Sequence, residues 1–410
     1  MCNLYICIIK PETMITLLEQ SERLVSNVRL DFKRYLFDFI KWENRLIGIK
    51  GARGTGKTTL LLQWIKEQNL PTEKAAYFSL DDLYFTNNTL KETVSQFYKN
   101  GGLILVLDEV HKYKNWSQEI KNCYDFFPDL KIIFTGSSII DITKQEGDLS
   151  RRALLYDLVG LSFREYLKML KIIELPVFSI DDILFNSDEI KKKIPKDFRP
   201  LNYFGSYLNY GYYPFGLENT SSVHQRINQL IRTIVEIDMA ELQDFDIRNA
   251  KKLLQLIYVI AQQVPFKPNI SNLAIKTGIH RNSLNNYLLY LEQAKIISLL
   301  SPTGNSIATL QKPEKIVLNN TTLLNALSEE KPLIGTVRET FFVSQLLTFH
   351  KVKLSKQADF LVNDKYTFEI GGKSKGQKQI EGIENAWIIK DDIELPLLNT
   401  IPLWLIGLLY

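Results

Sequence analysis

The sequence predicts an α/β fold built on a parallel sheet. Short apolar runs alternate with amphipathic stretches across residues 45–140. One run, Leu103–Leu107, consists of five consecutive aliphatic residues, which suits a strand covered on both faces of a parallel sheet. Strands that alternate with helices are joined by right-handed crossovers, so helices should cover both faces of this sheet.

The expected elements follow from apolar spacing and from helix stop signals. A helical region over residues 13–44 comes first. It is followed by strands at Arg45–Lys50, Ala75–Leu80, Leu103–Leu107 and Lys131–Phe134, and by helices at Thr59–Gln68 and Leu90–Lys99. After residue 150 the pattern changes. We expect helices over 160–245, an exposed loop or linker at Asp188–Pro200, short helices over 250–300, and short strands from residue 313 onward.

Composition limits the class of protein. A chain of 410 residues favours several domains, and 45% apolar with 23% charged residues is typical of a globular protein. No run approaches the roughly 18 apolar residues of a spanning helix, so we expect no membrane contact and a cytoplasmic location. The net charge of +4 is too small for a dedicated nucleic-acid binder but permits a local basic face. Cys2, Cys7 and Cys123 lack metal-site spacing, and we expect reduced thiols.

A phosphate-binding loop is predicted between the first strand and the next helix. The segment Gly51–Thr58 fits G-x-x-x-x-G-K-[ST] in full and has the strand and helix that the motif requires on either side. Its glycines let backbone N–H groups turn toward phosphate oxygens, Lys57 can reach the β- and γ-phosphates, and the Thr58 hydroxyl can bind Mg²⁺. The residues expected to hold ATP are Gly51, Ala52, Arg53, Gly54, Thr55, Gly56, Lys57, Thr58 and Thr59.

Two acids follow the buried aliphatic strand. Asp108 stands where a carboxylate holds the magnesium beside a phosphate loop, directly or through water. Glu109 is expected to polarise the attacking water as a general base. The alternative is a strand that ends in two solvated acids. His111 is a weaker candidate for a base.

Other polar residues are candidates for the γ-phosphate. Ser137 and Ser138 end the next expected strand, and Ser137 is preferred; either serine could instead cap a turn. Arg151 and Arg152 are candidates for an arginine finger, acting in cis or from a neighbouring subunit, or are simply solvated.

With these motifs in order, the stretch Gly51–Ser138 resembles the AAA+ ATPases. The whole chain resembles more closely a family of largely uncharacterised prokaryotic ATPases that join an AAA-type module to a domain like the PD-(D/E)XK nucleases. The supporting segments are Leu161–Tyr166, with Arg152 ten positions before Ser162, then Gly211–Pro214, Arg338–Phe342 and Phe368–Lys373.

This resemblance implies four parts. They are an AAA-type ATPase domain with a helical lead-in (1–160), a helical lid or linker (161–245), a winged-helix-like segment (246–312) and a small α/β nuclease-like domain (313–410). The ATPase domain would be a P-loop parallel sheet with helices on both faces. A contribution of Arg152 to a neighbouring subunit would imply a homo-oligomer.

A helix-turn-helix is expected at Ile270–Ile297, with Ser271 capping the first helix, Gly278 in the turn, a second helix over Asn282–Lys295 and a wing at Leu299–Ile307. Such a segment can contact DNA or serve for packing. In the C-terminal part, Glu339, Asp359 and Glu369 come in the order of a nuclease core. The lysine expected two positions after the last acid is replaced by Gly371, and Lys373 is the nearest later lysine. Metal-dependent cleavage is therefore the less favoured role for this domain.

The sequence thus predicts a Mg-dependent ATPase that couples turnover to rearrangement of its C-terminal domains. Two other functions remain open: a DNA-binding switch or regulator that only holds ATP, and an ATP-gated, Mg-dependent DNA nuclease.

Overall fold

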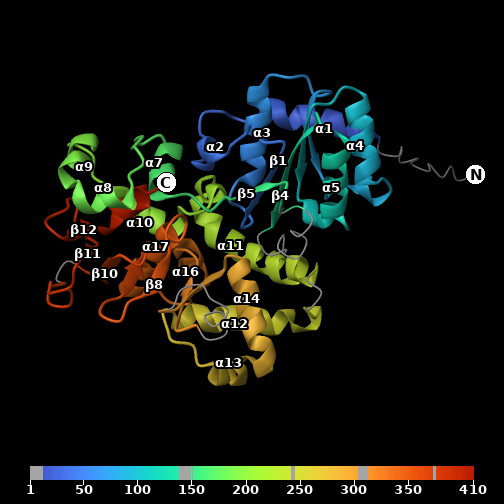
Figure 1. Ribbon diagram of the computed structural model, residues 1–410. Helices are drawn as coiled ribbons and strands as arrows, with labels where there is room; N and C mark the ends of the chain where they lie inside the picture. The colour runs from blue at the N-terminus through green and yellow to red at the C-terminus, as the bar shows by residue number, and fades with distance from the viewer. Residues whose placement is uncertain (1–12, 138–148, 150, 242–244, 303–312, 373–374) are drawn as a thin grey trace, which may run out of the picture. The chain divides into compact units, whose positions relative to one another are not determined.

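The computed structural model describes residues 13–137, 149, 151–241, 245–302, 313–372 and 375–410 (Figure 1). The chain forms two compact units. One consists of Met1–Gly51 and Gly56–Leu158, the other of Ala52–Thr55 and Val159–Tyr410. The four residues Ala52–Thr55 of the phosphate loop therefore group with the second unit.

The first unit holds a five-stranded sheet in the order β2-β3-β4-β1-β5, and all of its neighbouring strands are parallel. Its strands are β1 (Leu46–Gly51), β2 (Ala75–Ser79), β3 (Ile104–Asp108), β4 (Lys131–Ser137) and β5 (Leu154–Asp157). Its α-helices are α1 (Met14–Asn27), α2 (Leu36–Phe39), α3 (Lys57–Gln68), α4 (Leu90–Lys99) and α5 (Trp116–Phe126). The predicted α/β class is confirmed, as are four of these strands. The edge strand β5 was not anticipated.

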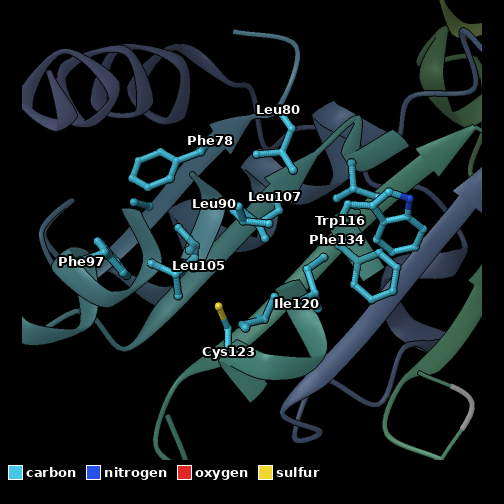
Figure 2. Packing of buried hydrophobic residues seen from close by; sticks show 14 of the residues in the cluster. Phe78, Leu80, Leu90, Phe97, Leu105, Leu107, Trp116, Ile120, Cys123 and Phe134 are labelled. Carbon is cyan, nitrogen blue, oxygen red and sulfur yellow. The ribbon is translucent and has the colours of Figure 1, made fainter. Parts of the chain in front are cut away.

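Alternate residues of the strands face opposite helices, as the period of a strand requires. Phe78, Leu105, Leu107 and Phe134 point to the side of α4 and α5, where they meet Phe97, Leu90, Ile120 and Trp116 (Figure 2). On the other side α3 contacts β1 and β2. Every residue of β3 is buried, as its aliphatic run predicts. Helices on both faces fix the sheet, so its strand ends form a rigid edge.

The expected helical region over residues 13–44 is only partly correct. Helix α1 ends at Asn27, and the chain resumes helical structure only at Leu36. Between them, Gln63 of α3 donates its side-chain amide to the carbonyls of Arg29 (2.7 Å) and Phe32 (2.8 Å). These tertiary hydrogen bonds satisfy carbonyls that a helix would otherwise use, so packing against α3 outweighs the local helical pattern.

The second unit begins with helices and ends with a sheet. Its helices are α7 (Phe163–Met169), α8 (Ile180–Phe185), α9 (Ser187–Lys193), α10 (Leu201–Tyr210), α11 (Val223–Thr233), α12 (Ala250–Gln263), α13 (Ile270–Thr277), α14 (Arg281–Gln293), α16 (Thr321–Leu327) and α17 (Ile334–Leu346). The loop predicted at Asp188–Pro200 is wrong in its first half, because α9 occupies it. Ion pairs Asp188–Lys191 and Glu189–Lys192 at i,i+3 spacing support this helix.

Two further sheets complete the second unit. Strands β6 (Ile297–Leu300) and β7 (Lys315–Leu318) form an antiparallel pair. The C-terminal sheet has the order β12-β11-β10-β9-β8, parallel from β10 to β12 and antiparallel from β8 to β10. Its strands are β8 (Val352–Leu354), β9 (Phe360–Val362), β10 (Tyr366–Gly371), β11 (Ala386–Lys390) and β12 (Thr400–Pro402). An additional α/β domain at the C-terminus is thus confirmed. Among the described residues no helix is long and apolar enough to cross a bilayer.

Candidate nucleotide-binding site

The parallel sheet of the first unit brings the sequence motifs to one edge. In parallel strands all carboxyl ends lie on the same side, where open α/β sheets bind ligands. Strand β1 ends at Gly51, β3 ends at Asp108, and β4 lies between them. The register places Gly51 opposite Ser137 at the end of β4. Three motifs that are far apart in the sequence therefore lie on adjacent strand ends.

The phosphate loop has the backbone that its glycines were predicted to provide. Gly54 and Gly56 have φ values of 79° and 93°, which disfavour any side chain. Gly56 is the N-cap of α3, so the helix begins at Lys57 with its N–H groups open to an anion. The Lys57 ammonium donates to the carbonyl of Gly51 at 2.9 Å and is buried at the end of β1. This arrangement suits the binding of a polyphosphate.

Asp108 is a buried carboxylate surrounded by hydroxyl groups. It is 2% exposed. Its Oδ2 accepts hydrogen bonds from the Thr58 hydroxyl at 2.6 Å and from the Tyr77 hydroxyl at 2.8 Å, and its Oδ1 accepts one from Thr135. The residue pair predicted to hold magnesium, Thr58 and Asp108, is thus in direct contact.

Tyr77 on β2 is a member of this group that the sequence did not reveal. Burial raises the pKa of its phenol far above the ordinary range, and the neighbouring charge of Asp108 raises it further. The phenol therefore remains protonated and acts as a donor to Asp108. The apolar pattern of a strand does not indicate that its tyrosine will face an acid of the next strand.

Glu109 occupies an unusual backbone conformation, with φ of 52°. Non-glycine residues in this region are strained, and such strain often occurs at functional sites. Its N–H donates to Asp108 Oδ1 and to the Thr135 hydroxyl, both at 3.1 Å. Its carboxylate stays 27% exposed while Asp108 is buried. The two acids therefore have different surroundings.

His111 contacts the Glu109 carboxylate. Its Nε2 lies 3.2 Å from Glu109 Oε2, and the imidazole is 1% exposed. Its Nδ1 accepts a hydrogen bond of 3.4 Å from the backbone N–H of Ser137. This placement favours a positioning role for His111 over the catalytic base considered from the sequence.

At the end of β4, the side chain that contacts Asp108 is that of Thr135 and not that of the preferred Ser137. Ser137 is buried and contacts His111 through its backbone. Thr135, two residues earlier on the same strand, is the side chain that reaches Asp108. Ser138 lies outside the described residues. The segment was therefore identified from sequence, but the residue bonded to the acid was not.

Arg152 makes two hydrogen bonds to Asp125, at 2.9 and 3.0 Å. Asp125 is in the last turn of α5, which starts after the carboxyl end of β3 and runs toward the opposite edge of the sheet. A phosphate contact within the same chain would require this pair to open. The roles predicted for Arg151 and Arg152 stay predictions.

Arg53 of the phosphate loop forms a bidentate ion pair with Asp238, at 2.7 and 2.8 Å. Asp238 is fully buried and ends a π-helical turn, Ile234–Asp238. Next to Arg53, a Cβ on Gly54 would lie 2.6 Å from the Phe215 ring. The aromatic turn that begins at Gly211 thus leads into a residue that supports the loop. Neither partner was identified from the sequence.

Three acids of the C-terminal part, Glu339, Asp359 and Glu369, lie close enough for their charges to interact. Burial raises the pKa of Glu339, and the charges of Asp359 and Glu369 raise it further, against the lowering effect of Lys315. Lys315 lies 2.5 Å from Glu339, and Lys375 lies 2.5 Å from Glu369.

The lysine that pairs with Glu369, the last of these acids, is Lys375. A Cβ on Gly371 would lie 2.6 Å from the Lys375 side chain, so the glycine makes room for it. The predicted Lys373 lies outside the described residues. Within the part of the chain that the structure describes, no group of three or more acid, His or Cys side chains is arranged to hold a metal.

Family models match two parts of the chain, and one of them covers the candidate nucleotide site. Residues 43–167 match a family described as an AAA domain, and residues 201–333 match a domain of unknown function (DUF8612). The uncharacterized protein MJ1637 of Methanocaldococcus jannaschii is 28% identical over 397 residues, covering 87% of this chain and 84% of that protein.

Two solved structures show weak likeness. AMPPCP-bound DnaA from Aquifex aeolicus is 17% identical over 68% of this chain and 87% of that chain, with a TM-score of 0.26. PCH-2 from C. elegans is 17% identical over 38% of this chain and only 45% of that chain, with a TM-score of 0.25. TM-scores of this size add nothing to the fold described above.

The AAA-domain match covers the segment that carries Gly51–Thr58, Asp108 and Glu109. It supports a nucleotide-binding protein of the P-loop ATPase kind. The second match crosses the boundaries predicted at residues 245 and 312 and names no activity. The four-part division and the nuclease-like resemblance of the C-terminal domain stay predictions.

Proposed function

We propose that this protein binds ATP with Mg²⁺ and hydrolyses it to ADP and phosphate. The observation that carries the proposal is the contact between Thr58 and Asp108, a hydroxyl and a buried carboxylate 2.6 Å apart beside the phosphate loop. Glu109 follows directly and keeps an accessible carboxylate. Two acids with different surroundings suit metal binding and base catalysis respectively.

The residues fit a magnesium ion. Mg²⁺ prefers oxygen ligands and is commonly held by one or two protein oxygens together with phosphates and water. Thr58 and Asp108 supply such oxygens, and the Tyr77 hydroxyl orients the carboxylate. When bound, the ion neutralises charge that develops on the phosphate oxygens. A cluster of three acids is not required for this role.

In the proposed reaction the oxygen of a water molecule bonds to the γ-phosphorus, and the bond from that phosphorus to the β–γ bridging oxygen breaks. Glu109 accepts the proton of the water, and the electron pair of the broken bond stays on ADP. Lys57 and the N–H groups of the loop stabilise charge on the phosphates. His111, 3.2 Å from Glu109, holds the base in position.

We further propose that turnover is coupled to rearrangement in the C-terminal domains. The Arg53–Asp238 pair supports this idea, because it ties a phosphate-loop residue to a π-helical turn more than 180 positions later in the chain. Such turns are frequent at functional sites. A homo-oligomer, with Arg152 serving the neighbouring subunit, belongs to the same proposal.

The test is a steady-state ATPase assay on three proteins. The wild type should release phosphate with Mg²⁺, Glu109→Gln should bind ATP with little turnover, and Lys57→Ala should lose binding. We expect the loss in Glu109→Gln to be about 100-fold or more. Equal, low turnover in all three proteins would contradict an ATPase.

The second candidate function is a switch that holds ATP and contacts DNA. Exposed basic residues in the winged-helix-like segment, including Lys267, Lys276 and Arg281, favour a DNA partner. In that case Lys57→Ala should lose ATP binding, while the wild type should bind ATP and release no phosphate.

An ATP-gated nuclease is the less favoured candidate. Each of Glu339 and Glu369 already has a lysine within 2.5 Å, so lysines offset the negative charge of these two acids without a metal. We expect no plasmid cleavage with Mg²⁺ under any nucleotide. Cleavage that disappears in Asp359→Ala would contradict this expectation.

A further inference from the structure

The stretch 250–300, called the basic module below, has an excess of positive charge. Residues 250–300 contain six lysines and arginines and one acid, a net charge of +5, whereas the whole chain carries +4. Five of the six basic residues are exposed. The acid, Glu292, is partly buried, and its carboxylate accepts a hydrogen bond of 2.9 Å from the N–H of Leu299. The exposed charges of this module are therefore mostly positive.

The helices and strand of the basic module, together with the next strand β7, occur in the order of a winged helix-turn-helix. Helices α12, α13 and α14 are followed by the antiparallel strands β6 and β7, and Phe266 forms a bridge to Ile316 of β7. Gly278, with φ of 63°, joins α13 to α14. In DNA-binding proteins of this type the helix after the turn enters the major groove. The cap of α13 is Asn269, not the predicted Ser271, and α14 runs from Arg281 to Gln293.

The outward face of α14 carries three exposed amide side chains, with the half-buried Leu289 between them. Asn282, Asn286 and Gln293 are exposed and lie at positions i, i+4 and i+11, on one side of the helix. The opposite side is buried through Leu284, Tyr287, Leu288 and Leu291. Asn and Gln side chains can form paired hydrogen bonds with N6 and N7 of adenine in the major groove. The exposed face thus suits base recognition.

The start of α13 offers a place for a phosphate. Lys267, Ser271 and Arg281 line a hollow of about 570 Å³ there, with Lys267 also 3.7 Å from Glu314. Positive side chains beside a helix N-terminus suit a DNA phosphate, which fixes the register of the protein on the duplex.

A protein partner fits this surface less well than DNA does. Within residues 250–300, all of which the structure describes, Ile275 on α13 is the one large apolar side chain that is exposed. Cores of protein interfaces are depleted in charged residues and enriched in aromatic ones. The surface of this module has the opposite composition.

We propose that α14 enters the major groove of double-stranded DNA and recognises adenine-containing base pairs through Asn282, Asn286 and Gln293. Lys267 and Arg281 contact the flanking phosphates. The inference goes beyond the proposed ATPase: it specifies a DNA duplex and the residues that would recognise it, and it rests on the DNA contact of the second candidate function.

Fluorescence anisotropy on the full-length protein without nucleotide tests the inference, with labelled duplexes that are A·T-rich or G·C-rich. The wild type should bind the A·T-rich duplex about tenfold more tightly. The pair of changes Asn286→Ala and Gln293→Ala should remove this preference. Lys267→Gln should weaken binding to both duplexes and reduce the salt slope by about one. Matched changes outside the module, Asn87→Ala and Lys356→Gln, should alter neither.

Three results would overturn the inference: no duplex binding by the wild type at low salt, equal binding to an RNA duplex, whose deep major groove excludes a helix, or reading-face variants that behave as the wild type. ATP turnover measured on the same variants keeps this question apart from the ATPase proposal. The DNA variants should retain turnover, whereas Lys57→Ala should lose it and keep DNA binding.

Discussion

At the scale of single residues, the account depends on how one buried carboxylate is held. Asp108 has three hydroxyl donors, and the Tyr77 phenol is one of them because burial keeps it protonated. Partners of this kind orient a metal ligand, and their removal commonly weakens metal binding or activity by about 10–100-fold.

Tyr77→Phe keeps the ring but removes the donor to Asp108. We expect it to raise the Mg²⁺ concentration needed for half-maximal turnover by about tenfold. A Mg²⁺ titration of ATPase rate measures this, with Tyr98→Phe, whose hydroxyl bonds to Asp129, as the matched control. An unchanged Mg²⁺ dependence would show that Tyr77 does not act through the metal ligand.

His111→Asn removes the imidazole that lies between Glu109 and the end of β4. Since a misplaced catalytic group can cost up to about 100-fold in rate, we expect kcat to fall by about tenfold or more with little change in KM. His224→Asn is the control, because His224 lies on α11 and bonds to a backbone carbonyl. A raised KM with an unchanged kcat would contradict a positioning role.

The site was only partly predictable at this scale. Lys57, Thr58, Asp108 and Glu109 could be predicted because their chemistry requires a fixed spacing in the sequence. Tyr77 and Thr135 carry no such spacing, and the sheet alone determines which hydroxyls face the acid. The same holds for Arg53, whose partner Asp238 lies in a distant helical segment. Contacts between segments distant in the chain leave little trace in local patterns.

At the scale of elements, local stereochemistry decides where helices turn. Gly278 has φ of 63°, and a Cβ there would meet nothing within 4 Å, so only backbone strain opposes a side chain. Gly205, inside α10, also has open space around it but ordinary helical backbone. Neither site is crowded, so the two glycines differ in backbone conformation alone.

Gly278→Ala should destabilise the protein by about 1 kcal/mol, because the left-handed conformation is unfavourable for alanine. Gly205→Ala should instead stabilise it by about 0.5–1 kcal/mol through helix propensity. Urea denaturation of both variants measures the difference. Changes of the same sign would contradict the backbone explanation.

Glu292 on α14 links the stability of the fold to pH. Burial raises the pKa of its carboxyl above the ordinary value of 4.5, so the folded state favours the neutral form. The stabilisation of the folded state by neutral Glu292 is complete below the pKa that this carboxyl has in the unfolded chain. It is lost as pH rises through the pKa of the carboxyl in the folded chain.

Glu292→Gln keeps an acceptor for Leu299 and stays neutral. Its Tm should exceed that of the wild type by about 1–3 °C near pH 8, and the two should converge near pH 4. Thermal unfolding across this range gives the comparison. A constant difference at all pH values would exclude titration of Glu292 as the cause.

Sequence patterns were reliable for elements whose packing agrees with local preference, such as β3 and α4. They failed where long-range contacts decide. The carbonyls after α1 accept hydrogen bonds from Gln63 of α3 instead of continuing a helix. The charged segment that was predicted as a loop begins with helix α9, which an ion pair supports.

At the scale of the whole molecule, the order of strands creates the site. Strand β4 lies between β1 and β3, so the phosphate loop, the two acids and the polar end of β4 meet at one edge. This convergence was predictable from the motif order, whereas the ion pair of Arg53 with Asp238, within the second unit, was not. Residues 250–300 add a module whose exposed charges are mostly positive.

Titration calorimetry with Mg·ATP tests the central claim most directly. The wild type and Glu109→Gln should give saturable heat with about one nucleotide bound per chain, and Lys57→Ala should give none, since its ammonium reaches the phosphates. Saturable binding by the wild type that persists unchanged in Lys57→Ala, or no saturable heat from the wild type, would contradict nucleotide binding at Gly51–Thr58.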